Sequence, residues 1–167
     1  MSDIRDVYGI GTKKANDLRR FYNIKSVRTL RAYVRKIPDI VTDSQRIGLR
    51  YHDRIKSGLS YKDATKHVNF IKKHIPRSVA AGSYRREMKR VNDIDILITG
   101  SLKNAINILK KKKYIIADLG YGETKFSGIA KLPRTNSMVR IDIIKTTKEE
   151  MPFTLLYFTG DFVQNIN

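Results

Sequence analysis

Cysteine is absent from the sequence, and histidine occurs only three times. Without cysteine the chain has no disulfides, no thiolate metal ligands and no cysteine nucleophile. A zinc site is disfavoured as well, because three scattered histidines do not replace the missing thiolates. We therefore expect any bound metal ion to have oxygen ligands.

Long apolar runs are also missing. The first residues, MSDIRDVYGIG, lack the apolar stretch of a signal peptide, and no segment approaches membrane-spanning length. No basic amphipathic helix with a Trp/Phe/Leu face suits a membrane surface either. We expect an intracellular protein without a membrane partner, in the nucleus, or in the cytoplasm if the source is viral or bacterial.

Acidic residues are scarce relative to basic ones. The 34 Lys and Arg against 16 Asp and Glu give a formal net charge of +18. Such an excess indicates a polyanionic partner, since each contact with a phosphate releases condensed counterions. Nucleic acid is the favoured partner, and a basic ribosomal or coat protein is the open alternative. With 41% hydrophobic residues the chain can still build a core.

The hydrophobic pattern changes period near residues 56–60. Before this point, spacing typical of helices predicts helices at 13–21, at 27–34 and from Ser44 onward. Beyond it, Ser60 is predicted to cap a helix that ends at Pro76. Strands are then expected at 78–83, 93–99, 114–119, 123–132 and 138–145, and helices at 102–112 and 149–158. The predicted class is α+β, with a helical lobe at 1–58, a mixed-sheet lobe at 59–148 and a further segment at 149–167.

Two predicted strands carry aspartates in alternation with isoleucines. Asp93 and Asp95 share one face of the first strand, and Asp142 lies on the polar face of the other. If these strands are neighbours, three carboxylates meet at one place, where they suit hard ions such as Mg²⁺. Two such ions can stabilise the entering and leaving oxygens of a phosphoryl transfer. The alternative is that the three aspartates are the solvated face of an ordinary sheet.

A glycine-serine pair stands just before the first of these strands, in Gly82-Ser83-Tyr84-Arg85-Arg86. Glycine allows the backbone to approach a ligand closely, and the serine hydroxyl and free N–H groups can bind phosphate oxygens. Arg86 adds a fork of donors that matches phosphate geometry. Together with the carboxylates, this segment is what a nucleoside triphosphate bound through metal ions requires.

The segment Val7-Tyr8-Gly9-Ile10-Gly11-Thr12-Lys13-Lys14-Ala15 is similar to a helix-hairpin-helix turn. Its glycines permit a tight turn that presents backbone N–H groups to a DNA phosphate, a contact that reads no sequence. A plain helix N-terminus is the alternative.

These motifs occur in the order and at spacings compatible with the family X, polymerase beta-like, DNA polymerases of the nucleotidyltransferase superfamily. The chain resembles that family at Gly82–Arg86, at Asn92-Asp93-Ile94-Asp95, at Gly122-Glu123-Thr124-Lys125-Phe126, at Arg140-Ile141-Asp142, at Tyr157-Phe158-Thr159-Gly160, and at Gln45-Arg46-Ile47-Gly48 of the fingers. The resemblance implies a fingers-like helical lobe followed by a nucleotidyltransferase palm.

The resemblance also implies a role for each matching residue. Two Mg²⁺ ions, or Mn²⁺ in their place, are expected at Asp93, Asp95 and Asp142, and a Na⁺ or K⁺ at the carbonyls of Arg5, Val7 and Ile10. A deoxynucleoside triphosphate is expected at Arg46, Gly82, Ser83, Arg86, Asn92, Tyr157, Phe158, Gly160 and Asp161. DNA, as primer-template or gapped substrate, is expected at Gly9, Gly11, Lys13, Lys14, Thr124, Lys125 and Arg140.

Compared with the family, the chain departs in three ways. It is expected to lack the amino-terminal lyase domain. It is also expected to lack the C-terminal subdomain that closes over the nascent base pair. A missing lobe or another subunit is therefore an expected partner near Phe153, Leu156, Tyr157 and Phe162. Asn92 and Glu87 stand where the family usually has glycine.

The leading hypothesis is a DNA-directed DNA polymerase that extends a primer 3′-hydroxyl during gap repair, weakly in this short form. The runner-up is a catalytically silent module that binds DNA ends or gaps. A nucleotidyltransferase acting on RNA or a small molecule is disfavoured by the hairpin turn.

Overall fold

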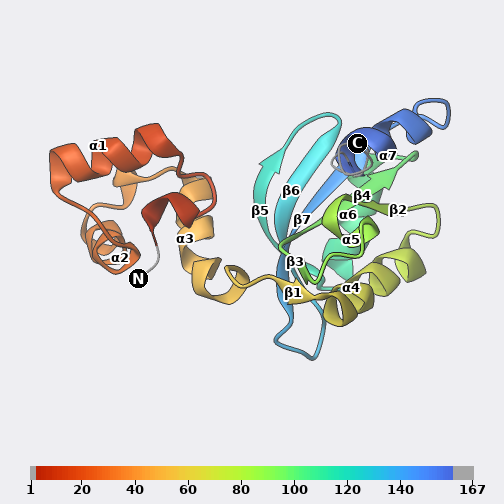
Figure 1. The fold of residues 1–167 in the computed structure, drawn as a ribbon, viewed down its shortest axis with the longest axis horizontal. Coiled ribbons are helices and arrows are strands. Elements are labelled where there is room, and N and C mark those ends of the chain that lie inside the picture. The colour runs from red at the N-terminus through yellow and green to blue at the C-terminus, as the bar shows by residue number, and fades with distance from the viewer. Residues whose placement is uncertain (1–2, 160–167) are drawn as a thin grey trace. The chain divides into compact units, whose positions relative to one another are not determined.

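The computed structural model describes residues 3–159 and divides the chain into two compact units, 1–56 and 57–167. Figure 1 labels their helices and strands. Within residues 3–159, no helix is both long and apolar enough to cross a membrane.

The first unit consists of short helices around one apolar core. Its elements are a 3-10 turn, Ile4–Asp6, helices α1 (Thr12–Tyr22) and α2 (Val27–Lys36), a second 3-10 turn, Pro38–Ile40, and helix α3 (Asp43–Ile55). Ser26 caps α2 by accepting the Thr29 N–H, and Thr42 forms a capping box with Gln45 at α3. The core collects the buried aliphatic side chains of all three helices, including Leu18, Leu30 and Leu49.

The second unit is a five-stranded mixed sheet with helices on both faces. In chain order it contains β1 (Leu59–Ser60), α4 (Tyr61–His74), β2 (Val79–Ala81), α5 (Gly82–Arg85), β3 (Arg90–Val91), β4 (Asp93–Ile98), α6 (Leu102–Lys111), β5 (Ile115–Tyr121), β6 (Lys125–Lys131), β7 (Met138–Lys145) and α7 (Met151–Thr159). The sheet order is β2-β4-β7-β6-β5, in which only β4 and β7 run parallel, and β1 pairs with β3 in a separate ribbon. The predicted α+β class is confirmed.

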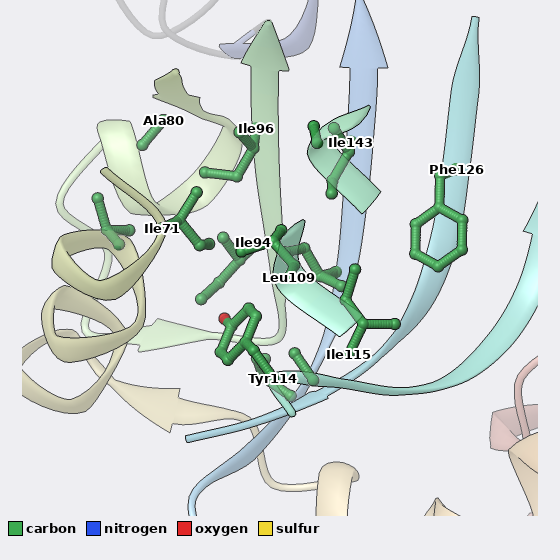
Figure 2. Close-up of a cluster of buried hydrophobic side chains, with 14 of the residues drawn as sticks. Ile71, Ala80, Ile94, Ile96, Leu109, Tyr114, Ile115, Phe126 and Ile143 are labelled. Atoms are coloured by element: carbon green, nitrogen blue, oxygen red, sulfur yellow. The ribbon is translucent and has the colours of Figure 1, made fainter. Parts of the chain in front are cut away.

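One face of the sheet is sealed by α4 and α6. Figure 2 shows Ile94, Ile96 and Ile143 of the sheet against Ile71 of α4 and Leu109 of α6, all part of one buried cluster. On the other face, α7 covers only a small cluster of Ala81, Leu97 and Ile144. Alternation along β4 and β7 therefore places their aspartates on the face that α4 and α6 do not cover.

A buried polar contact joins three distant parts of this unit. His67 of α4 contacts the Tyr114 hydroxyl through Nδ1 and the Ser137 hydroxyl through Nε2, both at 2.8 Å. Burial lowers the pKa of His67 from 6.5 to about 4, so this side chain is neutral at physiological pH. The network fixes the turn between β6 and β7 against the helical layer.

Several strands differ from the sequence-based expectation at their ends. The strand expected at 78–83 stops at Ala81, because Gly82 has φ +65° and begins the single turn α5. The strand expected from residue 123 starts at Lys125. The short pair β1–β3 was not predicted, since strands of two residues carry no periodicity.

Candidate active site

The three predicted carboxylates lie on two adjacent parallel strands. Asp95 of β4 is the direct register partner of Asp142 of β7, and Asp93 is the partner of Arg140. Ile94 and Ile96, between and after the β4 aspartates, are fully buried on the opposite face. The structure thus brings Asp93, Asp95 and Asp142 to one side of the sheet. It also places Arg140, which we expected along a primer strand, between two of them.

Arg140 bridges the carboxylates. Its Nε donates to Asp93 Oδ1 at 2.9 Å, and its two terminal nitrogens donate to the Asp142 oxygens at 3.0 and 2.9 Å. The Arg140 side chain is 16% exposed and that of Asp142 only 7%, so this ion pair is largely withdrawn from water. A guanidinium therefore supplies positive charge to two of the carboxylates, Asp93 and Asp142.

Asp95 has a raised pKa although Arg140 lies nearby. Burial, followed by the negative charges of Asp142 and Asp93, raises the pKa of Asp95 from 3.8 to about 6, and Arg140 only partly opposes this. A raised carboxyl pKa in a cluster of aspartates is typical of a site with uncompensated negative charge. Such a site favours an added cation.

Ser127 of β6 is a site residue that the sequence did not reveal. Its hydroxyl donates to Asp142 Oδ1 at 2.6 Å, because β6 pairs with β7 in a register that places Ser127 opposite Asp142. A serine on a strand carries no signal by itself. Ser127 lies two residues after Lys125, so the two side chains share one face of β6. This spacing is the only signal that could have placed Ser127 on the polar face of the sheet.

The glycine-serine segment lies directly beside the carboxylates. A Cβ atom at Gly82 would collide with the Asp95 carboxylate, and the φ of +65° also favours glycine. Tyr84 holds the following turn in place by stacking on Tyr61 of α4, with ring centroids 4.9 Å apart. Glu87, where the family usually has glycine, adopts a φ of +56°. The close approach of the Gly82 backbone to the Asp95 carboxylate therefore fits a loop that contacts phosphates.

The other residues expected at the nucleotide are more dispersed. Arg86 donates to the Thr159 carbonyl at 2.7 Å, and Ser83 is half-buried at the start of α5. Phe158 packs on the cluster under α7, whereas Tyr157 is 78% exposed. Asn92 is exposed at the start of β4. Arg46 belongs to the first unit, and Gly160, Asp161 and Phe162 lie outside the described residues.

The predicted hairpin turn lies between the first 3-10 turn and α1. Gly9 has φ +84°, and its carbonyl accepts a hydrogen bond from the Gln45 side chain at 2.8 Å. Gly11 occupies the N-cap position of α1, so no side chain caps the first N–H groups of that helix. Lys13 is exposed and Lys14 half-buried in the first turn of the helix.

The carbonyls expected to bind a monovalent cation belong to the same turn. The Val7 carbonyl accepts the Ile10 N–H at 3.0 Å, and the side chain of Arg5 is paired with Asp3. Thr124 and Lys125, expected along the primer, are exposed at the start of β6 in the second unit.

Among residues 3–159, no group of three or more His, Cys, Asp or Glu side chains is arranged to hold a metal ion. The expectation that the three carboxylates share divalent cations stays a prediction. They share a face, but Asp93 and Asp142 are turned to Arg140. The donor chemistry still fits a hard divalent ion, because all three ligands are carboxylates and Asp95 is left with repulsion from its neighbours.

Residues 60–148 match the family model described as DNA polymerase beta palm. The match spans more than half of the chain, so the chain belongs to this family, and the predicted membership in the family X DNA polymerases is confirmed. Family X polymerases generally use divalent metal ions.

Individual relatives agree with this assignment. The chain is 27% identical to the DNA nucleotidylexotransferase of Xenopus laevis over 92% of its length, and 26% identical to the DNA polymerase lambda of Rattus norvegicus over 93%. It spans only 39% and 30% of those two proteins. A solved ternary P/T complex of Leishmania infantum polymerase beta matches 98% of this chain and 70% of its own, with TM-score 0.86 and 25% identity.

Proposed function

We propose that this chain carries out DNA-directed addition of deoxynucleotides to a primer 3′-hydroxyl by two-metal phosphoryl transfer, in gap repair. The observation that carries the proposal is the register of β4 and β7, which sets Asp95 beside Asp142 next to the Gly82 backbone. The proposal is supported by the family and by the relatives, which are polymerases and nucleotidyltransferases.

Asp93, Asp95 and Asp142 would hold two Mg²⁺ or Mn²⁺ ions. When bound, such ions polarise the phosphate and lower the pKa of the attacking hydroxyl. Asp142, held by Ser127 on the neighbouring strand, would orient toward the primer 3′-hydroxyl. A divalent ion at Asp142 would compete with Arg140 for the two Asp142 oxygens. Arg140, Thr124 and Lys125 would contact the primer strand.

The triphosphate would be held by Ser83 and Arg86 of the second unit, with the backbone at Gly82 and Asn92 close to it, and Arg46 of the first unit stays a sequence-based expectation. Tyr157, Phe158 and the two residues outside the described range, Gly160 and Asp161, would contact the sugar and base. In the first unit, the N–H groups near Gly9 and Gly11 and the side chains of Lys13 and Lys14 would bind the DNA backbone without reading its sequence. A Na⁺ or K⁺ at the carbonyls of Arg5, Val7 and Ile10 would strengthen that contact.

Exposed apolar side chains on α7 provide a place for a further partner. Phe153 is 75% exposed and Leu156 50%, beside the exposed Tyr157. Large apolar side chains gathered on one short helix are typical of a surface that another lobe or subunit covers. We include such a partner in the proposed function, because selection of the incoming base needs a wall against the new base pair.

The runner-up function is a catalytically silent DNA-end or gap-binding module, and the observation that favours it is the Arg140 bridge. With Asp93 and Asp142 already paired to a guanidinium, the fold satisfies these carboxylates without a metal ion. A protein without catalytic activity could keep Arg140, Asp93 and Asp142 as purely structural ion pairs.

Primer extension on gapped DNA with Mg²⁺ distinguishes the two functions. The wild type is compared with Asp142→Ala and with the control Asp118→Ala, which removes an exposed aspartate of β5 paired with Lys110. The polymerase proposal predicts that extension is lost in Asp142→Ala and kept in the control. DNA binding that weakens with salt, with no extension by any of the three proteins, would establish the binding module instead.

A further inference from the structure

A groove of about 520 Å³ lies on the second unit, between α4 and the turn that joins β6 to β7. From α4 it is lined by Lys66, Asn69, Phe70 and Lys73, and from the turn by residues 132–135. Helix α4 packs on the face of the sheet that is opposite the three aspartates. The groove is therefore separate from the candidate active site, and the proposed function gives it no role.

The lining of the groove is basic. Its charged residues are Lys66, Lys73 and Arg134, and no carboxylate from residues 3–159 lines it. Within the same range Lys73 and Arg134 form no ion pair. Lys66 is paired only with Asp63, at 3.7 Å, and both side chains are open to solvent, where an ion pair contributes little. The groove therefore carries positive charge that a polyanion can neutralise.

Hydrogen bonds hold the turn against α4. His67, on the buried side of the helix, contacts the Ser137 hydroxyl through Nε2 at 2.8 Å. Inside the turn, Lys131 Nζ donates to the Thr135 carbonyl at 2.7 Å, and the Thr135 hydroxyl donates to the Leu132 carbonyl at 2.9 Å. Both walls of the groove are thus in place before a ligand binds, which lowers the entropic cost of binding.

Arg134 keeps an unusual backbone conformation in this turn. Its φ is +65°, a value that residues with a Cβ atom rarely adopt. Its side chain is exposed, and no ion pair within residues 3–159 accounts for an arginine at this position. Strained backbone of this kind is concentrated at functional sites such as ligand clamps.

Apolar surface lies among the cations. Phe70 is half-buried and packs on Tyr114 and His74, with ring centroids 4.9 and 4.6 Å apart. Leu132 and Pro133 contribute the apolar surface of the opposite wall. A row of phosphates needs no apolar contact, whereas unpaired bases pack on aromatic and other apolar side chains. The lining therefore suits a ligand with both phosphates and exposed bases.

We propose that the groove between α4 and the β6–β7 turn binds a single-stranded segment of nucleic acid. Its bases lie against Phe70 and Pro133, and its phosphates contact Lys66, Lys73 and Arg134. Nucleic acid is the polyanion in question because the chain belongs to a DNA polymerase family and has a net charge of +18. A strand bound here is held on the opposite side of the sheet from the carboxylates.

The test uses the full chain without divalent metal, so that it measures binding and not turnover. The groove variant is Lys66→Gln/Lys73→Gln/Arg134→Asn, in which asparagine tolerates the positive φ. The matched control, Lys103→Gln/Lys111→Gln/Arg77→Gln, removes two lysines and one arginine that are exposed and do not line the groove. Melting curves establish that both variants fold.

Binding is measured by fluorescence anisotropy with a labelled strand of 20 thymidines and with the same strand in a duplex. For the single strand, we expect the groove variant to bind about tenfold more weakly at moderate salt. The slope of log K against log salt should fall by about 2, as loss of three phosphate contacts requires. The control should stay near wild type, and duplex binding should not distinguish the two variants.

A cross-link locates the bound strand. One thymidine is replaced by 5-iododeoxyuridine, the complex with wild-type protein is irradiated, and tryptic peptides are identified by mass spectrometry. We expect the label on the peptide 67–72, which contains Phe70. Phe70→Leu keeps the apolar character of the position and should abolish this cross-link.

Equal weakening of single-strand binding in the groove variant and the control would show that only diffuse charge matters and would overturn the proposal. So would the absence of label on the peptide 67–72, or duplex binding that depends on the groove as strongly as single-strand binding does. Competition by poly-glutamate at equal charge concentration would identify a site for acidic chains in general instead. Each of these results leaves the polymerase proposal standing, since that proposal depends on the carboxylates of the other face.

Discussion

Replacement of Arg140 is the sharpest perturbation of the candidate site. Arg140→Gln keeps most of the side-chain volume but removes the cation that joins Asp93 to Asp142. Asp142 is then left buried without a charged partner, and Asp95 loses the one group that lowers its pKa. The three carboxylates repel one another, and we expect the fold to lose stability at neutral pH.

The loss should be near the lower end for a broken buried ion pair, about 3 kcal/mol, because Asp93 is 44% exposed and keeps part of its hydration. For a domain of this size that corresponds to a fall in melting temperature of roughly 10 °C. The loss should shrink as the pH is lowered. Asp95 has a folded pKa of about 6 against 3.8, so the folded state binds more protons in this window, and stability falls as pH rises from about 4 to 6.

Thermal unfolding monitored by circular dichroism at pH 7 and pH 5 measures both effects. Lys145→Gln, at the exposed end of the same strand, is the matched control for loss of one positive charge. Mg²⁺ should restore part of the lost stability of Arg140→Gln at pH 7 and should act less on the wild type, where Arg140 competes for the same oxygens. Equal melting temperatures for Arg140→Gln and Lys145→Gln, or a loss that does not depend on pH, would refute this account of the site.

Three further changes test other parts of the structure. His67→Gln should reduce the loss of stability at acid pH. In the wild type the folded His67 pKa is about 4, so the free energy of unfolding falls by up to about 3 kcal/mol between pH 6.5 and pH 4. Urea unfolding at several pH values measures this, and an equal pH dependence of the unfolding free energy in the wild type and the variant would contradict it. Gly82→Ala should cost at least about 1 kcal/mol by strain and by its clash with Asp95, whereas Gly100→Ala, which meets no atom within 4 Å, should be neutral in the same denaturation assay. Ser127→Ala should weaken Mn²⁺ binding about tenfold as measured by electron paramagnetic resonance, and Ser127→Thr should retain it; unchanged binding in the alanine variant would show that Ser127 does not position Asp142.

Much of the fold followed from local patterns in the sequence. The change of hydrophobic period predicted helices before residue 60 and strands after it, and capping by Ser60 and the break at Pro76 placed α4 closely. These signals are readable because side-chain spacing and helix caps depend on near neighbours in the chain. Element ends were less predictable where a single residue decides them, as with Gly82.

The candidate site was likewise predictable only where it depends on residues close together in the chain. The sequence by itself determined that Asp93 and Asp95 share a face, since alternation along one strand requires it. Only the tertiary structure decided that Asp142 stands beside Asp95, that Arg140 bridges the carboxylates and that Ser127 contacts Asp142. The physical reason is that pairing and register between strands distant in the chain are set by how their apolar faces pack on a common core, which no single segment encodes.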